Sequence, residues 1–190
     1  MRMALLVGVV AFFGAGQAPS RLAVIREAPH FSLMDQAEKP VQLTALKGKV
    51  LLVSFIFTTC NGSCPATTHR MGAVQQELKS RGLWKPEDVQ FLSITLDPER
   101  DTPDALQRYM KLYDLDPAGW SFLTGPPATV TATVTAWSMW VKAAANGQLD
   151  HPSRIFLVDR QLRVREIYNT ELLAPGNVCD DIALLLHSPK

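Results

Sequence analysis

The chain has 190 residues, of which 47% are hydrophobic and 19% are charged. This composition is that of an ordinary globular protein, and the length suits a single domain with a real hydrophobic core. Nineteen basic residues nearly balance eighteen acidic ones, for a formal net charge of +1. We therefore expect no nucleic-acid partner, because nucleic-acid binding depends on a basic excess.

The first residues have the pattern of an export signal. Arg2 supplies a positive start, and residues 4–15 are uncharged and almost wholly apolar. A run of about a dozen apolar residues suits a signal-peptide core, whereas a spanning helix usually needs about 20. We expect a signal peptide or short membrane anchor over residues 1–18, a linker over 19–27 and one domain over 28–190. The domain is then exported, either periplasmic or anchored facing the periplasm, with membrane contact only through the N-terminal segment.

Hydrophobic patterns and turn residues divide the rest of the chain into strands and helices. Residues 40–43 suit a short edge strand, and residues 50–57 are a continuous apolar run typical of a central strand buried on both faces. The later segments are a helix over 65–79, a strand over 89–96, a helix started by 101–103 and ending near 113, a strand over 120–123, a helix over 127–137, a hairpin of strands 154–158 and 164–168, and a helix over 175–187. This order predicts the α/β class, with a central mixed β-sheet flanked by helices.

A pair of cysteines lies where the predicted central strand meets the next helix. Cys60 and Cys64 are four residues apart, and three cysteines in all are too few for a disulfide scaffold. In a helical turn this spacing separates the α-carbons by about 6 Å and points both sulfurs to nearly one face, so the pair can form a disulfide or share a metal ion. A cysteine pair in this position, closed by a later hairpin and helix, is the thioredoxin-like arrangement. Cys179, on the last helix, is expected to be a core residue.

The start of a helix stabilises thiolates through its dipole and free N–H groups, and thiolates favour soft ions such as Cu(I), or zinc. Two sulfurs leave most metals under-coordinated, so a third ligand is needed. Of the four histidines, His151 stands out because it lies in a loop ahead of the 154–158 strand, opposite the cysteine loop in a thioredoxin-like sheet. His30, His69 and His187 lack such a position. His151 is at this point either a ligand or an exposed loop histidine.

Three motifs in order resemble the Sco/SenC family of copper chaperones. They are Cys-x-x-x-Cys-Pro after a buried strand, Asp-Pro-Glu-Arg-Asp-Thr-Pro after the next strand, and Asp-His before a later strand, here at 60–65, 97–103 and 150–151. The resemblance covers about residues 28–170. It implies a thioredoxin-like domain, usually tethered to a membrane, that binds one copper ion, Cu(I) or Cu(II), through Cys60, Cys64 and His151.

The resemblance also implies a task and partners. The task is copper delivery to, or thiol reduction of, the binuclear copper site of cytochrome c oxidase. The expected partners are that copper-site subunit or another copper acceptor, and a thioredoxin-like reductant. This describes a metallochaperone rather than an enzyme.

Other functions use the same cysteines differently. An extracytoplasmic thiol-disulfide oxidoreductase would use a reversible Cys60–Cys64 disulfide without metal, and would not need His151. A peroxiredoxin is disfavoured, since Phe57 and Val53 stand where that class carries Thr and Pro.

The motif at 97–103 invites a structural interpretation. An ion pair between Asp97 and Arg100 can shape this loop. Residues 101–103 are explained as the start of a helix, and we assign them no chemistry.

Overall fold

The computed structural model describes residues 22–144, 147–171 and 173–187. The expected export segment, residues 1–18, lies outside this range, as do residues 19–21 of the expected linker. Within the described residues, eight strands form one sheet in the order β1-β10-β9-β4-β5-β6-β2-β3, and the short strands β7 and β8 pair with each other.

The centre of the sheet consists of three parallel strands, β4 (Val50–Ile56), β5 (Val89–Thr95) and β6 (Trp120–Thr124). Every residue of β4 is buried, including the polar Ser54, as its largely apolar run predicted. On the other side of β4 lies the antiparallel hairpin of β9 (Ile155–Val158) and β10 (Arg163–Tyr168). The predicted α/β class with a mixed sheet is therefore confirmed.

The outer strands are β1 (Arg26–Glu27), β2 (Ser32–Asp35) and β3 (Pro40–Gln42), the last leading into the 3-10 helix η1 (Leu43–Leu46). β3 is an edge strand, as predicted, whereas β1 and β2 were not predicted.

The expected linker needs a correction, because residues 22–27 pack onto the domain. Leu22 is buried, its carbonyl accepts hydrogen bonds from Arg165, and β1 pairs with β10. The alternation of this segment is too short to stand out in the sequence as a strand.

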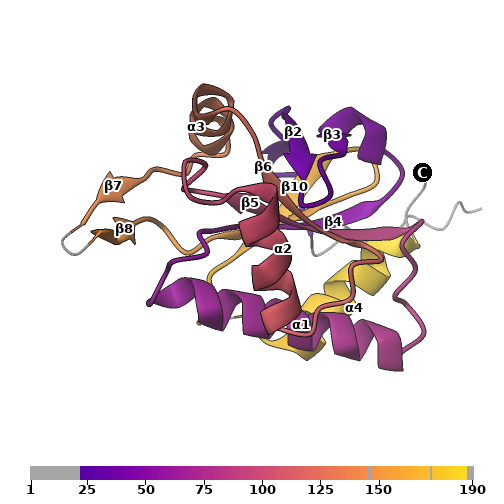
Figure 1. Ribbon diagram of the computed structural model, residues 1–190. Coiled ribbons are helices and arrows are strands. Elements are labelled where there is room, and N and C mark those ends of the chain that lie inside the picture. Colours follow the sequence, from indigo (N-terminus) through magenta and orange to yellow (C-terminus); the bar gives the residue numbers. More distant parts are fainter. Residues whose placement is uncertain (1–21, 145–146, 172, 188–190) are drawn as a thin grey trace, which may run out of the picture.

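In the described part of the chain, four α-helices flank the sheet (Figure 1): α1 (Ser63–Ser80), α2 (Pro103–Leu112), α3 (Pro127–Ala136) and α4 (Pro175–Leu186). α1 and α4 lie together below the sheet in this view, and α3 lies above it beside β2. On the α3 side the rings of Phe156 and Trp137 pack edge to face, with centroids 5.1 Å apart. In the part of the chain that the structure describes, no helix has the length and apolar character to cross a membrane.

A two-stranded ribbon projects beyond one end of the sheet, at the left of Figure 1. It consists of β7 (Lys142–Ala143) and β8 (Leu149–Asp150), and it was not predicted. β8 ends at the residue before His151, so the ribbon leads directly into the segment that carries the predicted histidine ligand.

Candidate metal centre

The cysteine loop leaves the sheet at the carboxyl end of β4. Phe57 is buried directly after the strand, and the chain then turns, with the Cys60 N–H donating to the Phe57 carbonyl over 3.2 Å. α1 begins at Ser63, two residues before the predicted start, so Cys64 lies in its first turn. The predicted strand-to-helix junction is thus confirmed. Cys60 is half-buried, and residues 61–63 between the cysteines are exposed.

His151 contacts the second cysteine. Its Nε2 lies 3.6 Å from the Cys64 sulfur, and its Nδ1 lies 3.0 Å from the Pro152 carbonyl oxygen. A carbonyl only accepts hydrogen bonds, so Nδ1 carries a proton, and in the neutral ring the Nε2 lone pair faces the sulfur. The imidazole also packs edge-on against the Phe57 ring, with centroids 5.9 Å apart. The end of β4 therefore supports both the cysteine loop and the histidine.

The electrostatics of Cys64 differ from the sequence-based expectation. Cys64 is only 1% exposed. Its burial raises the pKa of the thiol well above the usual value, and the neighbouring Cys60 thiol adds a smaller effect in the same direction. We expected the helix start to stabilise a thiolate here, but desolvation is the larger effect at this position. The Cys60 sulfur instead accepts the Gly62 N–H over 3.3 Å.

The donor set fits a soft metal ion in chemistry and in spacing. In zinc sites thiolate sulfur lies at about 2.3 Å and imidazole nitrogen at about 2.0 Å, so two such donors on one tetrahedral or trigonal ion are about 3.5–3.7 Å apart. The Cys64 sulfur and His151 Nε2 lie 3.6 Å apart, within this range. Among the described residues, no three His, Cys, Asp or Glu side chains stand together as a complete ligand cluster. The Cys64–His151 contact is thus the pre-arranged part of the predicted set, and Cys60 lies on the adjoining loop.

Gln148, which sequence reasoning missed, joins the ribbon to the cysteine loop. Its side-chain oxygen accepts the Asn61 N–H over 3.1 Å, and its side-chain nitrogen donates to the Thr59 carbonyl over 3.1 Å. Two hydrogen bonds in opposite senses hold the backbone on both sides of Cys60. No local sequence pattern marks a glutamine for such a task.

Asp101 was also missed, because a helix start explained its motif. Its carboxylate is buried at the ends of β4 and β5, where it accepts hydrogen bonds from Thr58 and Thr95. The expected ion pair earlier in the motif is present, with Arg100 Nη1 2.8 Å from Asp97 Oδ2.

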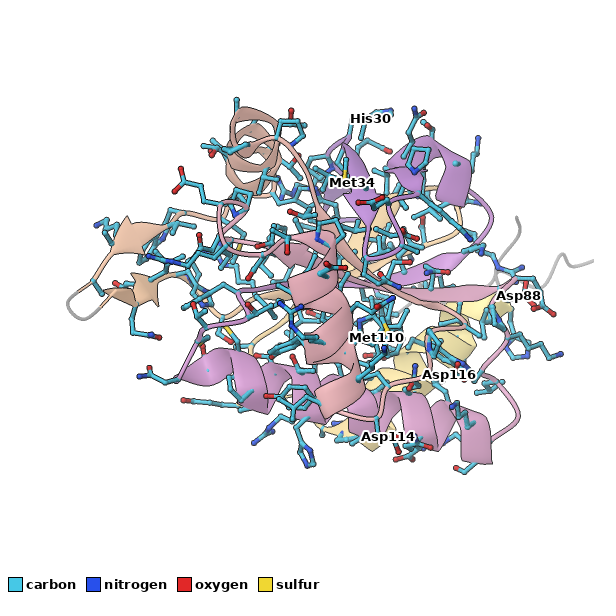
Figure 2. All side chains as sticks on the ribbon, viewed as in Figure 1. His30, Met34, Asp88, Met110, Asp114 and Asp116 are labelled. Carbon is cyan, nitrogen blue, oxygen red and sulfur yellow. The ribbon has the colours of Figure 1, made fainter. Side chains whose placement is uncertain are left out.

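The other candidates lie elsewhere. Figure 2 shows His30 beside β2, well apart in that view from the β7–β8 ribbon. His69 is exposed on α1, and His187 Nδ1 bonds to the Ala183 carbonyl at the end of α4. Cys179 is fully buried, as predicted, and all three cysteines are free thiols.

The fold and the site together define a thioredoxin-like domain whose Cys-x-x-x-Cys loop faces a histidine. The chain belongs to the SCO1/SenC family, whose model matches residues 21–187. It is 34% identical over 146 residues to the SCO1 protein homolog of Bacillus subtilis, a match that spans 75% of this chain and 74% of that protein.

Solved structures agree with this assignment. The structure of Bradyrhizobium japonicum ScoI with copper bound is 28% identical and aligns with a TM-score of 0.72, over 84% of this chain and 99% of that one. BsSco, described as having a disulfide switch and as a member of the Sco family of cytochrome c oxidase assembly proteins, is 29% identical, with a TM-score of 0.77 over 87% and 97% of the two chains.

Proposed function

We propose that this protein is a copper chaperone that binds one copper ion through the sulfurs of Cys60 and Cys64 and Nε2 of His151. The carrying observation is the Cys64–His151 contact, in which a sulfur and a nitrogen donor lie at ligand spacing beyond the carboxyl end of β4. Family membership and the copper bound to Bradyrhizobium japonicum ScoI support copper as the ion. Two thiolates and an imidazole are ligands that suit Cu(I).

The proposed task is to deliver copper to the binuclear site of cytochrome c oxidase, or to keep the thiols of that site reduced. A set of three protein ligands leaves an open coordination position on the copper ion. A ligand from the acceptor protein can bind there before the ligands of this protein dissociate. A closed cage of four ligands would resist such transfer. The copper-site subunit is the proposed acceptor, and a thioredoxin-like protein is the proposed reductant.

The alternative is a thiol-disulfide oxidoreductase, which the placement of two free cysteines four residues apart, on the loop after β4 and in the first turn of α1, favours. In this reaction Cys60 and Cys64 give two electrons and two protons to a partner disulfide. Their own sulfur–sulfur bond forms, and the partner leaves as two thiols. The related BsSco carries a described disulfide switch, which makes the same chemistry reasonable here.

We further propose that the domain works outside the cytoplasm, as a periplasmic or membrane-anchored protein. The apolar run over residues 4–15 supports export. Fractionation of cells that express the full chain tests this directly, since recovery with cytoplasmic markers would contradict it.

Copper titration of the reduced protein tests the chaperone proposal. We expect one high-affinity copper per chain in the wild type. The Cys179→Ser variant should bind the same, because the Cys179 sulfur of the wild type is buried in the core. The Cys60→Ser/Cys64→Ser double variant should lose that site. Equal stoichiometry and affinity in the wild type and the double variant would overturn the proposal.

A further inference from the structure

A carboxylate without a basic partner is buried next to the cysteine loop. Asp101 is 0% exposed, and among the described residues no lysine, arginine or histidine forms an ion pair with it. Its Oδ1 accepts the Thr58 hydroxyl over 2.6 Å, and its Oδ2 accepts the Thr95 hydroxyl over 2.6 Å. The Thr58 N–H lies 3.2 Å from both oxygens. The carboxylate therefore joins the ends of β4 and β5 by hydrogen bonds alone.

Starting the next helix does not require this carboxylate. Thr102 is the N-cap of α2, where its hydroxyl accepts the Ala105 N–H, and Pro103 occupies the first turn. Burying a carboxylate is costly unless its hydrogen bonds are satisfied. A neutral hydroxyl or amide side chain could join the two strand ends with a smaller loss of solvation free energy. The presence of a carboxylate at position 101 therefore needs another explanation.

The contacts of Asp101 explain its position. Thr58 follows the buried Phe57 and lies inside the turn closed by the bond from the Cys60 N–H to the Phe57 carbonyl. Asp101 holds both the backbone N–H and the hydroxyl of Thr58, so it fixes the turn two residues before Cys60. On the other side, Gln148 holds the backbone at Thr59 and Asn61.

We propose that Asp101 is a positioning residue for the cysteine pair, which anchors Thr58 and thereby holds Cys60 close to Cys64. This rests on the proposed function only in that the pair is the working site, whether it binds copper or forms a disulfide. A held loop raises the effective concentration of one sulfur at the other. The anchored turn therefore favours the Cys60–Cys64 disulfide and any ion that both sulfurs share.

The test is the equilibrium of the protein with reduced and oxidised glutathione. The two thiols give two electrons and two protons to glutathione disulfide, which becomes two glutathione thiols as the Cys60–Cys64 bond forms. In Asp101→Asn we expect the equilibrium constant for disulfide formation to fall about threefold to tenfold, the order expected for one lost anchoring bond. A tenfold fall raises the potential by about 30 mV. Faster amide exchange at residues 58–60 should accompany the fall.

Two further variants separate positioning from plain structural support. Thr58→Val keeps the side-chain shape and the backbone bond but removes the hydroxyl, so it should shift the equilibrium in the same direction by a smaller factor. It also replaces Asp101→Asn as the test if that variant does not fold. Thr102→Ala removes the cap of α2 and should lower thermal stability without moving the equilibrium. An unchanged equilibrium in Thr58→Val, or an equal shift in Thr102→Ala, would overturn the positioning role.

The same samples distinguish this inference from the proposed function. Loss of copper affinity in Asp101→Asn alongside the redox shift is the expected result. If the wild type binds no copper, the chaperone proposal fails, while the glutathione measurements still decide the role of Asp101.

Discussion

The Cys64 sulfur and Nε2 of His151 lie 3.6 Å apart, although 87 positions separate them in the chain. Cys64 is in the first turn of α1, and His151 follows the β7–β8 ribbon. Phe57 packs against the imidazole from the end of β4, and the Pro152 carbonyl fixes Nδ1 as the protonated nitrogen. These contacts direct Nε2 of the imidazole toward the Cys64 sulfur.

From this contact we predict that His151→Ala weakens copper binding far more than it affects the disulfide. Changes in partners that only orient a ligand cost about 10- to 100-fold in metal affinity, so losing the ligand itself should cost at least that. The Cys60–Cys64 disulfide needs only two sulfurs within reach. Its reduction potential should therefore stay close to the wild-type value.

Copper affinity and potential are measured on the same preparations, with His69→Ala as the control. His69 is exposed on α1, so its substitution should change neither copper affinity nor reduction potential. Unchanged affinity together with a large shift in potential would make His151 a redox-tuning residue and favour the oxidoreductase alternative.

The unequal exposure of the three cysteines predicts their order of alkylation. Cys60 is half-buried on an exposed loop, whereas Cys64 is 1% exposed and its pKa is raised by burial. Burial also raises the pKa of Cys179 to about 11. Thiolate is the reactive form, so iodoacetamide at pH 8 should modify Cys60 at least about tenfold faster than the other two. Peptide mass spectrometry over time checks the order, and earlier modification of Cys64 would contradict it.

The two hydrogen bonds from the Gln148 side chain to the cysteine loop predict a measurable effect on copper affinity. Gln148→Ala removes both hydrogen bonds to the loop around Cys60, each of which contributes about 0.5–1.5 kcal/mol net. The bonds are exposed to solvent, so we expect copper affinity to fall about threefold to tenfold, with overall stability little changed. Gln76→Ala, at an exposed position on α1, is the matched control. Equal effects of the two substitutions would deny Gln148 a role at the site.

Features with a local signature were predictable from the sequence. The buried run of β4, the Cys60–Cys64 spacing and the proline that follows are all contained in one short stretch. Helix bounds were close, since α4 was expected over 175–187 and spans Pro175–Leu186. His151 was predicted to face the cysteine loop because its loop position and a family motif agreed, and its ring does lie beside Cys64.

The features that were missed depend on tertiary contacts. Asp101 lies in a motif that a helix start explains, and only the fold brings its carboxylate to Thr58. Gln148 acts through backbone groups 87 and 89 positions away. The expected thiolate at Cys64 followed from the helix start alone, whereas the packed domain buries the sulfur and reverses the effect.

Far from the cysteines, a buried acidic centre predicts how stability depends on pH. Asp159 is 1% exposed and lies in the turn between β9 and β10, where Arg163 Nε and Arg165 Nη1 donate to its Oδ2 over 2.9 and 2.8 Å. Burial alone would raise the pKa of this carboxyl, but the hydrogen bonds of the two arginines outweigh it, and the pKa is lowered from its ordinary value of 3.8. Arg165 also bonds to the Leu22 carbonyl, so the same centre holds the N-terminal segment on the domain.

Because folding lowers this pKa, the ionised carboxylate stabilises the folded state above about pH 4, and that contribution is lost as the pH falls through the folded-state value. Asp159→Asn should therefore lower the free energy of unfolding at pH 7, and its difference from the wild type should shrink as the pH falls below about 4. Urea unfolding of both proteins at pH 7 and pH 3 gives the difference in their free energies of unfolding. The contributions of the other carboxyl groups are the same in both proteins and largely cancel in this difference. Glu99→Gln, at an exposed position, should leave the two pH curves nearly parallel. A difference for Asp159→Asn that stays constant or grows toward pH 3 would mean that hydrogen-bond geometry, rather than the charge of Asp159, stabilises this turn.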